Sequence, residues 1–526
     1  MAQTDGYPHL PADVRPIAVL ADEDRIAHIR AERWIPHAAA ERVLGHLQEA
    51  FDQPPRKRRE NVLLLDESGM GESLLLEKFE RTNAAAFDEA SGTQRRPVLA
   101  VLMPPNPTET EFFECVLEAV AAPSAGYWMQ GARLRASAVR LLRDLGVRVL
   151  VIDEINSVLA GTPRQQRLFL QLLRFLSNEL GVALVCAGVP EARHALLSDP
   201  QLRSRFSDVE LPPWVPGDDL RDFVTRLTWS SPPREPSPVD AAKLRALLAE
   251  RSDGITLSIC KAVERAAVAA IRGGRERIDL ASFEDPEIWR GMASTGRERR
   301  PLGNALRRRR PYGDGSLRDG AGRRARARRG VRPPPKPLPL APRPLPGESL
   351  PSWVGRVGAR YDLSAPEFLA CLRVDRGAYA PHASWLDREA DAELDRSLAA
   401  ATRLDVARIE ALRVAGPGAP EAAGWARRLT TWCPECLCDD VARHGEVYER
   451  AAWRLGCCVT CPVHGRLLTE SCPACEAPAC GFRPIGGRLR PVCDMCSRVV
   501  DCQSAWKRGS SANSVVGSRR PVRMGT

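Results

Sequence analysis

The sequence predicts an α/β domain with a parallel sheet, followed by a smaller, mainly helical domain that binds metal. Short apolar runs alternate with helical patterns over the first 290 residues. Twelve of the 16 cysteines fall between positions 433 and 502, and a stretch rich in arginine and proline separates the two regions. With 526 residues the chain is too long for one ordinary core, so at least two domains are expected.

The bulk composition is that of a soluble globular protein, with 44% hydrophobic and 27% charged residues. The first residues lack a basic segment followed by an apolar run, and no stretch of 18 apolar residues occurs. We therefore expect a cytoplasmic protein that makes no contact with a membrane.

Residues 25–51 have apolar side chains at helical spacing, with a break at 34–36, and follow a tail at 1–24. A basic run at 56–59 comes next. Such a run is most often a solvated surface, and a contact to phosphate or DNA is the other interpretation.

Four apolar runs predict buried strands at 62–65, 97–102, 147–152 and 182–188. An amphipathic helix is predicted around 168–180. Strands of this kind alternating with helices predict a parallel sheet covered on both faces.

The first strand leads into a glycine loop and then a helix, which is the layout of a phosphate-binding loop. The usual pattern is G-x-x-x-x-G-K-[ST]; Gly71 and Ser73 fit it, and Gly69 adds a second glycine to the loop. Asp66 stands at the first glycine position and Glu72 at the lysine position. The layout predicts a site for ATP with Mg²⁺, while the charge of its central side chain is inverted.

The pair Asp153-Glu154 follows the third strand directly. Beside a phosphate loop, the first carboxylate would hold Mg²⁺ and the second would orient or deprotonate the attacking water. An acidic strand end that faces solvent is the alternative. The glycine loop some 80 residues upstream favours the functional interpretation.

Six stretches of this region match the motifs of a known family in their order: residues 25–30, 33–35, 153–155, 198–202, 205–206 and 269–272. With them, the region from 25 to about 290 resembles TniB, the AAA+ ATPase subunit of one class of transposons. The resemblance implies ATP-dependent assembly on DNA, with Gly254 beside the nucleotide and Arg203 and Arg205 as candidates for an arginine that acts on a neighbouring subunit's nucleotide. The alternative is that both are ordinary surface arginines after a helix. Val189 stands where such ATPases often keep a polar sensor.

Glu72 opposes nucleotide binding by its charge. At an effective dielectric constant of ~20, two like charges at ~4 Å repel by about 4 kcal/mol, or roughly a thousandfold in affinity. We expect ATP hydrolysis to be weak or absent.

Residues 291–346 form the predicted linker, rich in arginine and then in proline. The fifteen Lys or Arg residues and three acids at 296–336 give a local charge of +12, so the other residues together carry −2 of the formal +10. The composition of residues 291–332 predicts disorder, and the proline-dense residues 331–346 predict an extended, semi-rigid spacer. Contact with DNA phosphates, a solubilising linker and a relic of two fused reading frames all remain open.

Eight ligands with regular spacing predict two structural zinc sites. Pairs with two intervening residues suit tetrahedral Zn²⁺, and the 17 residues between the two pairs of the second set are typical of Cys₄ sites. The first set is Cys433, Cys436, Cys461 and His464, and the second is Cys472, Cys475, Cys493 and Cys496.

The region from about 333 to 502 resembles a truncated TniQ, the zinc-binding partner protein of the same transposons. The resemblance is carried by residues 345–353, the Trp432-Cys433-Pro434-x-Cys436 pair, residues 453–455 and Cys461-Pro462-x-His464-Gly465. We place the second domain at residues 347–502, after the linker, and a polar tail at residues 503–526.

The two resemblances imply an accessory protein of DNA transposition. We expect it to assemble on double-stranded target DNA as a homo-oligomer, with nucleotide, and to recruit or regulate a separate TniA-like transposase. The alternative is a DNA and protein adaptor that does not hydrolyse ATP, or a decayed transposon remnant.

Overall fold

The structure, a computed structural model, describes residues 7–54, 59–123, 131–292, 335–372, 386, 391–414, 427, 430–478 and 480–500. The predicted linker lies mostly outside these residues, as do the polar tail and Cys502. Among the described residues, no helix has the length and apolar composition needed to cross a membrane.

A five-stranded sheet forms the centre of the first half, in the order β4-β5-β6-β1-β7. The pairs β1 with β6, β4 with β5 and β5 with β6 are parallel, and Val62 lies opposite Val185 in the register of the first pair. Four strands confirm the predicted apolar runs. The strands are β1 (Asn61–Leu65), β4 (Val98–Leu102), β5 (Val149–Asp153), β6 (Ala183–Gly188) and β7 (Phe206–Val209).

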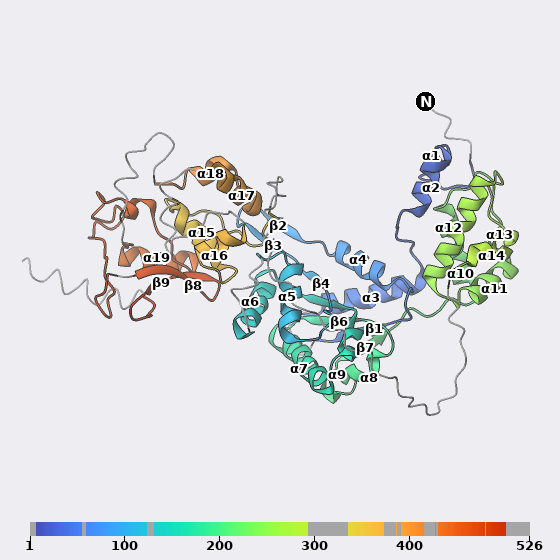
Figure 1. Cartoon of the computed structure of the whole chain (residues 1–526), viewed down its shortest axis with the longest axis horizontal. Coiled ribbons are helices and arrows are strands. Elements are labelled where there is room, and N and C mark those ends of the chain that lie inside the picture. Colours follow the sequence, from blue (N-terminus) through green and yellow to red (C-terminus); the bar gives the residue numbers. More distant parts are fainter. Residues whose placement is uncertain are drawn as a thin grey trace, which may run out of the picture. The chain divides into compact units, whose positions relative to one another are not determined.

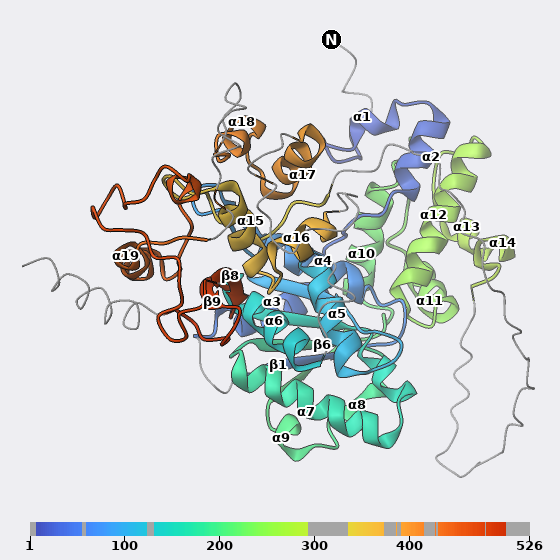
Figure 2. The ribbon, with the colours of Figure 1, turned by 60° about the vertical axis from the view of Figure 1, so that its left-hand side comes forward.

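Both faces of this sheet are covered. Every residue of β1 and of β6 is buried, and successive side chains of a strand point to opposite faces. A fully buried strand therefore needs cover on both sides, which is the arrangement of the predicted P-loop α/β fold. Figures 1 and 2 show α7 (Pro163–Glu179), α8 (Ala192–Leu196) and α9 (Pro200–Arg203) together on one side of the sheet.

The described residues group into two compact units. One contains Met1–His46, Asp66–Lys78 and Val209–Pro333, and the other contains Leu47–Leu65, Phe79–Asp208 and Pro334–Thr526. The sheet and the cysteine-rich region thus belong to one unit.

The unit that holds the chain start is helical. The break predicted at 34–36 lies between α2 and α3. Its core includes Ile26, Leu220, Val263 and Phe283. Its helices are α1 (Arg15–Ala18), α2 (Asp22–Arg30), α10 (Asp218–Trp229), α11 (Ala242–Arg251), α12 (Thr256–Arg272), α13 (Leu280–Glu284) and α14 (Pro286–Trp289), while α3 (Ala38–Asp52) and α4 (Glu72–Thr82) run from this unit into the other.

The other unit has one continuous apolar core that includes Leu150 and Leu184 of the sheet and Trp353 and Phe368 of the C-terminal half. Its remaining elements are β2 (Ala86–Asp88), β3 (Thr93–Arg95), α5 (Glu109–Ala119), α6 (Gly131–Asp144), a 3₁₀ helix at Ile155–Ala160, α15 (Leu350–Ala359), α16 (Ala365–Cys371), α17 (Ala392–Thr402), α18 (Val406–Glu410), α19 (Pro434–His444), a 3₁₀ helix at Ala451–Arg454, β8 (Cys480–Ile485) and β9 (Arg488–Cys493).

The last arginine of the basic run at 56–59 is not the solvated side chain that composition suggested. Arg59 is buried and donates hydrogen bonds to the carbonyl oxygens of Ala50, Phe51 and Gln53 at the end of α3. It also reaches the carbonyl oxygen of Arg148 at 2.9 Å. A cation at a helix C-terminus satisfies carbonyl groups that have no partner within the helix.

Candidate functional site

The glycine loop has the predicted strand–loop–helix form. Gly69 and Gly71 have φ values of +89° and +99°, a conformation that glycine adopts without steric cost. The loop leaves β1 at Leu65, and α4 begins at Glu72. Backbone N–H groups in the first turn of a helix attract anions, so the backbone layout suits a phosphate.

Glu72 brings its own negative charge to this helix end. It is the acidic residue in the first turn of α4, where a carboxylate interacts favourably with the helix dipole by about 0.3–1 kcal/mol. A nucleotide phosphate would have to occupy the same end of the helix against that charge. Ser73, the next residue, is exposed.

Asp66, at the first glycine position, is part of the loop's structure. Its side chain is buried, and Oδ1 accepts a hydrogen bond from the backbone N–H of Leu211 at 2.7 Å. The exchange of glycine for aspartate therefore adds a contact that glycine could not make.

The residues after Gly254 contact the loop, while Gly254 itself contacts another backbone segment. The N–H of Leu257 donates to the carbonyl oxygen of Gly69 at 2.9 Å, and a Cβ on Gly69 would lie 3.2 Å from Ile255 Cγ2. Gly254 has a φ of +72°, and its Cβ would come within 2.7 Å of the carbonyl oxygen of Trp214. Gly254 therefore allows the backbone at the start of α12 to approach the backbone of Trp214 closely, and it does not line the loop.

Asp153 and Glu154 stand at the end of β5 and the start of the following 3₁₀ helix, as predicted. Glu154 has a φ of +55°, and its N–H donates to Asp153 Oδ1 at 2.8 Å. Burial raises the pKa of Asp153 above its usual value. Asn156, which no sequence motif singles out, donates from Nδ2 to Glu154 Oε2 at 3.1 Å.

A left-handed conformation at a non-glycine residue costs free energy and is concentrated at functional sites. In Glu154, the hydrogen bond from Asn156 engages one carboxylate oxygen, Oε2. Asp153 remains the candidate ligand of Mg²⁺, and Val189, at the predicted sensor position, follows β6 directly.

The two arginines that could act on a neighbouring subunit's nucleotide both form hydrogen bonds within their own chain. Arg203 donates from Nε and Nη2 to the carbonyl oxygen of Leu197, at 2.9 and 2.7 Å. Arg205 donates from Nη1 to Asn178 Oδ1 at 2.7 Å. A role on a neighbouring subunit's nucleotide stays a prediction for both.

The first cysteine and histidine set comes together as predicted. The ligand atoms of Cys433, Cys436, Cys461 and His464 lie within 4.8 Å of one another. Cys436 Sγ is 3.6 Å from Cys461 Sγ and 3.3 Å from His464 Nδ1. Four ligands at tetrahedral Zn²⁺ with ~2.3 Å bonds would be about 3.8 Å apart, so the side chains fit this ion.

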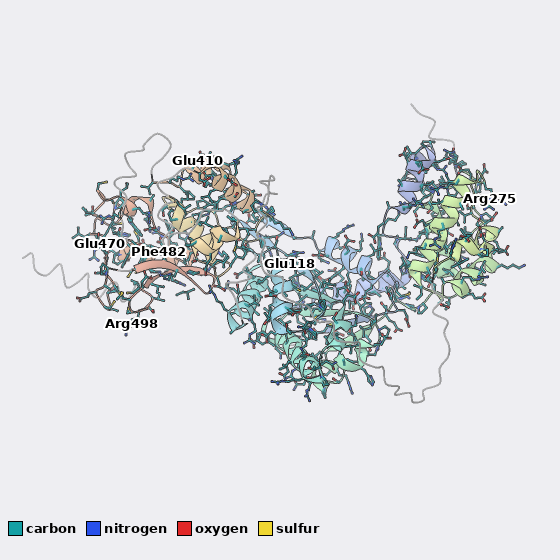
Figure 3. The ribbon with its side chains drawn as sticks, viewed as in Figure 1. Glu118, Arg275, Glu410, Glu470, Phe482 and Arg498 are labelled. Carbon is teal, nitrogen blue, oxygen red and sulfur yellow. The ribbon has the colours of Figure 1, made fainter. Side chains whose placement is uncertain are left out.

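The second set, Cys472, Cys475, Cys493 and Cys496, is equally compact. Cys472 Sγ lies 3.8 Å from Cys496 Sγ, and Cys475 Sγ lies 3.5 Å from Cys493 Sγ. The antiparallel β8–β9 pair carries Cys493 at its end, as in a zinc ribbon. Phe482 on β8, labelled in Figure 3, packs beside this cluster.

One thiol in each set has a lowered pKa. A hydrogen bond with Cys436 lowers the pKa of Cys433 to about 5, and the backbone N–H of Cys496 lowers the pKa of Cys493 to about 6. Metal ligation requires thiolates, and these two thiols are the first of their sets to deprotonate. Their hydrogen bonds raise the pKa of Cys436 and of Cys475, so the remaining protons have to leave when a metal binds. Among the described residues, Cys438, Cys457, Cys458 and Cys480 are not members of either set.

The fold and these sites define a P-loop α/β domain joined to a cysteine-rich domain with two clusters suited to zinc. Comparison with protein families gives the particular identity. Residues 25–216 match the family model described as "Bacterial TniB protein", and residues 339–468 match the TniQ model. The chain therefore carries a TniB domain followed by a TniQ domain, which implies a role in transposition.

No curated protein matches the chain. Among solved structures, it is similar to Cdc6p from Pyrobaculum aerophilum, with 17% identity, a TM-score of 0.36, and coverage of 49% of this chain and 68% of that one. The ORC1 protein of Aeropyrum pernix in complex with DNA gives 18% identity, a TM-score of 0.34, and coverage of 49% and 67%. Neither similarity is strong enough to carry an argument about function.

Proposed function

We propose that this protein is an accessory factor of DNA transposition that assembles on target DNA and recruits or regulates a separate transposase, with its AAA+ domain serving assembly rather than ATP hydrolysis. The observation that carries the second part is Glu72. The loop is folded, its glycines have the required φ values, and a carboxylate stands where a lysine would meet the phosphates.

DNA binding rests on charge. The segment at 296–336 holds a net charge of +12, which suits the phosphate backbone without sequence preference. The two zinc clusters would hold the TniQ domain in its folded form, because cysteine-rich tetrahedral ligation leaves no position open for catalysis.

A second candidate is nucleotide-dependent assembly. It is favoured by Asp153 and the strained Glu154, which keep the positions of a magnesium ligand and a water-orienting base. In this case ATP with Mg²⁺ would bind despite Glu72 and would tighten DNA binding.

The salt dependence of DNA binding tests the proposal. We expect a labelled duplex to bind with the same affinity with and without ATP and Mg²⁺. Replacing Arg307, Arg308, Arg309 and Arg310 by serine should lower the slope of log K against log salt by about 3.6, since each phosphate contact contributes about 0.9.

The matched control replaces four exposed arginines of the first half by serine, and should leave the slope unchanged. Affinity that rises strongly with ATP would instead establish the second candidate. The control positions are Arg164, Arg167, Arg272 and Arg275, the last labelled in Figure 3.

A further inference from the structure

A short hairpin of the TniB half pairs with the segment that leads into the TniQ half. β2 and β3 are antiparallel, with Phe87 opposite Gln94. Residues 339–341 then continue the sheet on the free side of β3. Thr93 and Leu340 form an antiparallel bridge, the Gln94 N–H donates to the Pro339 carbonyl oxygen at 2.7 Å, and the Ala341 N–H donates to the Gly92 carbonyl oxygen at 2.8 Å.

The prolines of this segment suit its place in the sheet. Pro339 has no N–H group to donate, but here it only accepts a hydrogen bond through its carbonyl oxygen. Proline is tolerated in a sheet at an edge strand, which is the position that residues 339–341 take.

Only glycine fits at position 92 beside the added strand. Its φ is +69°, and a Cβ at this position would lie 1.9 Å from the carbonyl oxygen and 2.9 Å from the carbonyl carbon of Ala341. Both atoms belong to the backbone, so no side-chain rotation can relieve the contact. Gly146 has a similar φ of +66°, but no atom lies within 4 Å of its Cβ position.

Arginines of the TniQ half hold the hairpin through charge and ring contacts. Arg343 donates from Nε to the Glu89 carbonyl oxygen at 2.7 Å and from Nη2 to Glu89 Oε2 at 2.6 Å. The guanidinium carbon of Arg403 lies 3.9 Å from the centre of the Phe87 ring, a cation–π contact. Figure 1 shows β2 and β3 beside α17, the helix that Arg403 caps.

A second patch of contacts joins α6 to the TniQ half. Arg140 Nη1 lies 2.6 Å from Asp362 Oδ2, and Arg140 Nη2 donates to the carbonyl oxygen of Arg360 at 3.0 Å. The other oxygen of Asp362 accepts the Gly487 N–H at 3.2 Å. Gly487 lies between β8 and β9, so this carboxylate links the TniB half to the zinc ribbon.

We propose that the β2–β3 hairpin is a receptor for residues 338–343 of the same chain, and that this strand addition, not the covalent linker, holds the TniQ domain to the TniB domain. Strand addition is an established mode of peptide recognition, in which backbone hydrogen bonds give affinity. Leu338, Leu340 and Ala341 of the added segment are buried, so the strand also contributes apolar contact.

The occupant is the chain's own segment because covalent tethering raises its effective concentration to the order of mM. A segment from a second copy would have to compete at the concentration of free protein. Every copy of the protein therefore carries its TniQ domain in place, and no separate TniQ has to be recruited to the hairpin. This inference does not depend on nucleotide or DNA binding.

Cleavage of the linker tests the inference. A protease site is inserted in the full-length chain between residues 300 and 330, the protein is cut, and the fragments are separated by gel filtration at micromolar concentration. We expect the two fragments to elute together. Fragments of the natural protein that separate after cutting would overturn the proposal.

Two glycine variants make the test specific. Gly92→Ala should weaken the association of the cut fragments by about tenfold to a hundredfold, because overpacking costs of this kind reach 1–3 kcal/mol. Gly146→Ala carries the same backbone strain without the contact and should not weaken it. Equal effects of the two variants would contradict the role of Gly92.

A charge exchange covers the case in which Gly92→Ala fails to fold. Arg343→Glu should weaken association, and adding Glu89→Arg should restore it, since the two side chains form an ion pair. Failure of the second change to restore association would contradict the direct contact.

A disulfide identifies the copy that supplies the strand. Thr93→Cys and Leu340→Cys together place two thiols at directly opposed positions, and each single variant serves as the background control. After oxidation we expect a cross-link within one chain on a non-reducing gel. A cross-linked dimer absent from the single variants would overturn the assignment to the same chain.

Discussion

In the proposed function, Glu72 is the residue that limits the chemistry of the TniB domain. A lysine at this place would attract the β- and γ-phosphates, whereas the carboxylate repels them and interacts with the end of α4 itself. Asp66 and Val189 depart from the usual pattern as well. Asp66 has gained a structural hydrogen bond to Leu211, so this departure has become part of the loop.

Arg25 is a residue whose loss should unfold part of the helical unit. Its side chain is 0% exposed and donates two hydrogen bonds to Glu276, at 2.8 and 2.6 Å, and one to the Pro232 carbonyl oxygen. Arg25→Ala leaves Glu276 with Arg234, 3.5 Å away, as its remaining cationic partner, so we expect a loss of about 3 kcal/mol.

Arg30 on the same helix provides the control for Arg25. It lies 3.7 Å from Glu264 with more than a third of both side chains exposed, and Arg30→Ala should cost less than about 1 kcal/mol. Hydrogen exchange of α12 in the full-length protein measures both losses. Similar losses for the two variants would contradict the account.

Asp153 should make stability depend on pH. Because burial raises the pKa of this carboxyl in the folded state, the folded protein holds the proton more tightly than the unfolded chain does. The stabilising contribution is complete below the ordinary aspartate pKa of about 4 and is lost as pH rises through the folded pKa.

Asp153→Asn removes this pH dependence. The melting temperature of the variant should therefore exceed that of the natural protein by an amount that grows between pH 4.5 and pH 8. The exposed carboxylate of Asp13, replaced in Asp13→Asn, should show no such trend. A constant gain for Asp153→Asn across this range would refute the assignment.

At the scale of elements, the two metal centres should be independent and structural. Metal analysis of the full chain should give about two zinc ions. Cys436→Ser should remove about one of them and destabilise the region around Trp432 and Trp453, which pack in the same cluster. Cys457→Ser alters an exposed thiol outside both sets and should keep both ions. A folded protein without metal would show that the clusters are not zinc sites.

The elements that the sequence predicts well are those whose signal is local. β1, β4, β5 and β6 are nearly continuous apolar runs, and each lies within two residues of its predicted range. The metal sets are predicted from spacing alone, because two ligands with two residues between them already form one turn. Glu72 is also identified from its position in the loop pattern.

Other elements could not be predicted because their residues contact partners that lie far away in the sequence. β2 and β3 have three residues each, and most of these are polar or small. Their added strand lies some 245 positions further along the chain, at Leu340. Arg59 belongs to a basic run by composition, and its burial is explained by carbonyl groups at the end of α3 and at Arg148, which lies far away in the sequence. Asn156 has no sequence pattern to distinguish it.

At the scale of the whole molecule, the TniB and TniQ domains share more than a covalent link. The apolar core of one compact unit includes residues of both, and the hairpin contacts at Gly92 and the ion pair of Arg140 lie within that unit. A chain built in this way would bring the TniQ domain to DNA in equal number with the TniB domain.

In the proposed function, Glu72 removes the nucleotide chemistry of an otherwise folded loop. Titration calorimetry with ATP and Mg²⁺ on the natural protein, Glu72→Gln and Glu72→Lys tests it most directly, since glutamine removes the repulsion and lysine also adds the attraction. For the natural protein we predict a Kd for ATP that is millimolar or weaker. Glu72→Gln should bind with intermediate affinity, and Glu72→Lys should gain affinity by roughly a thousandfold or more. Micromolar binding by the natural protein that Glu72→Lys leaves unchanged would contradict the claim.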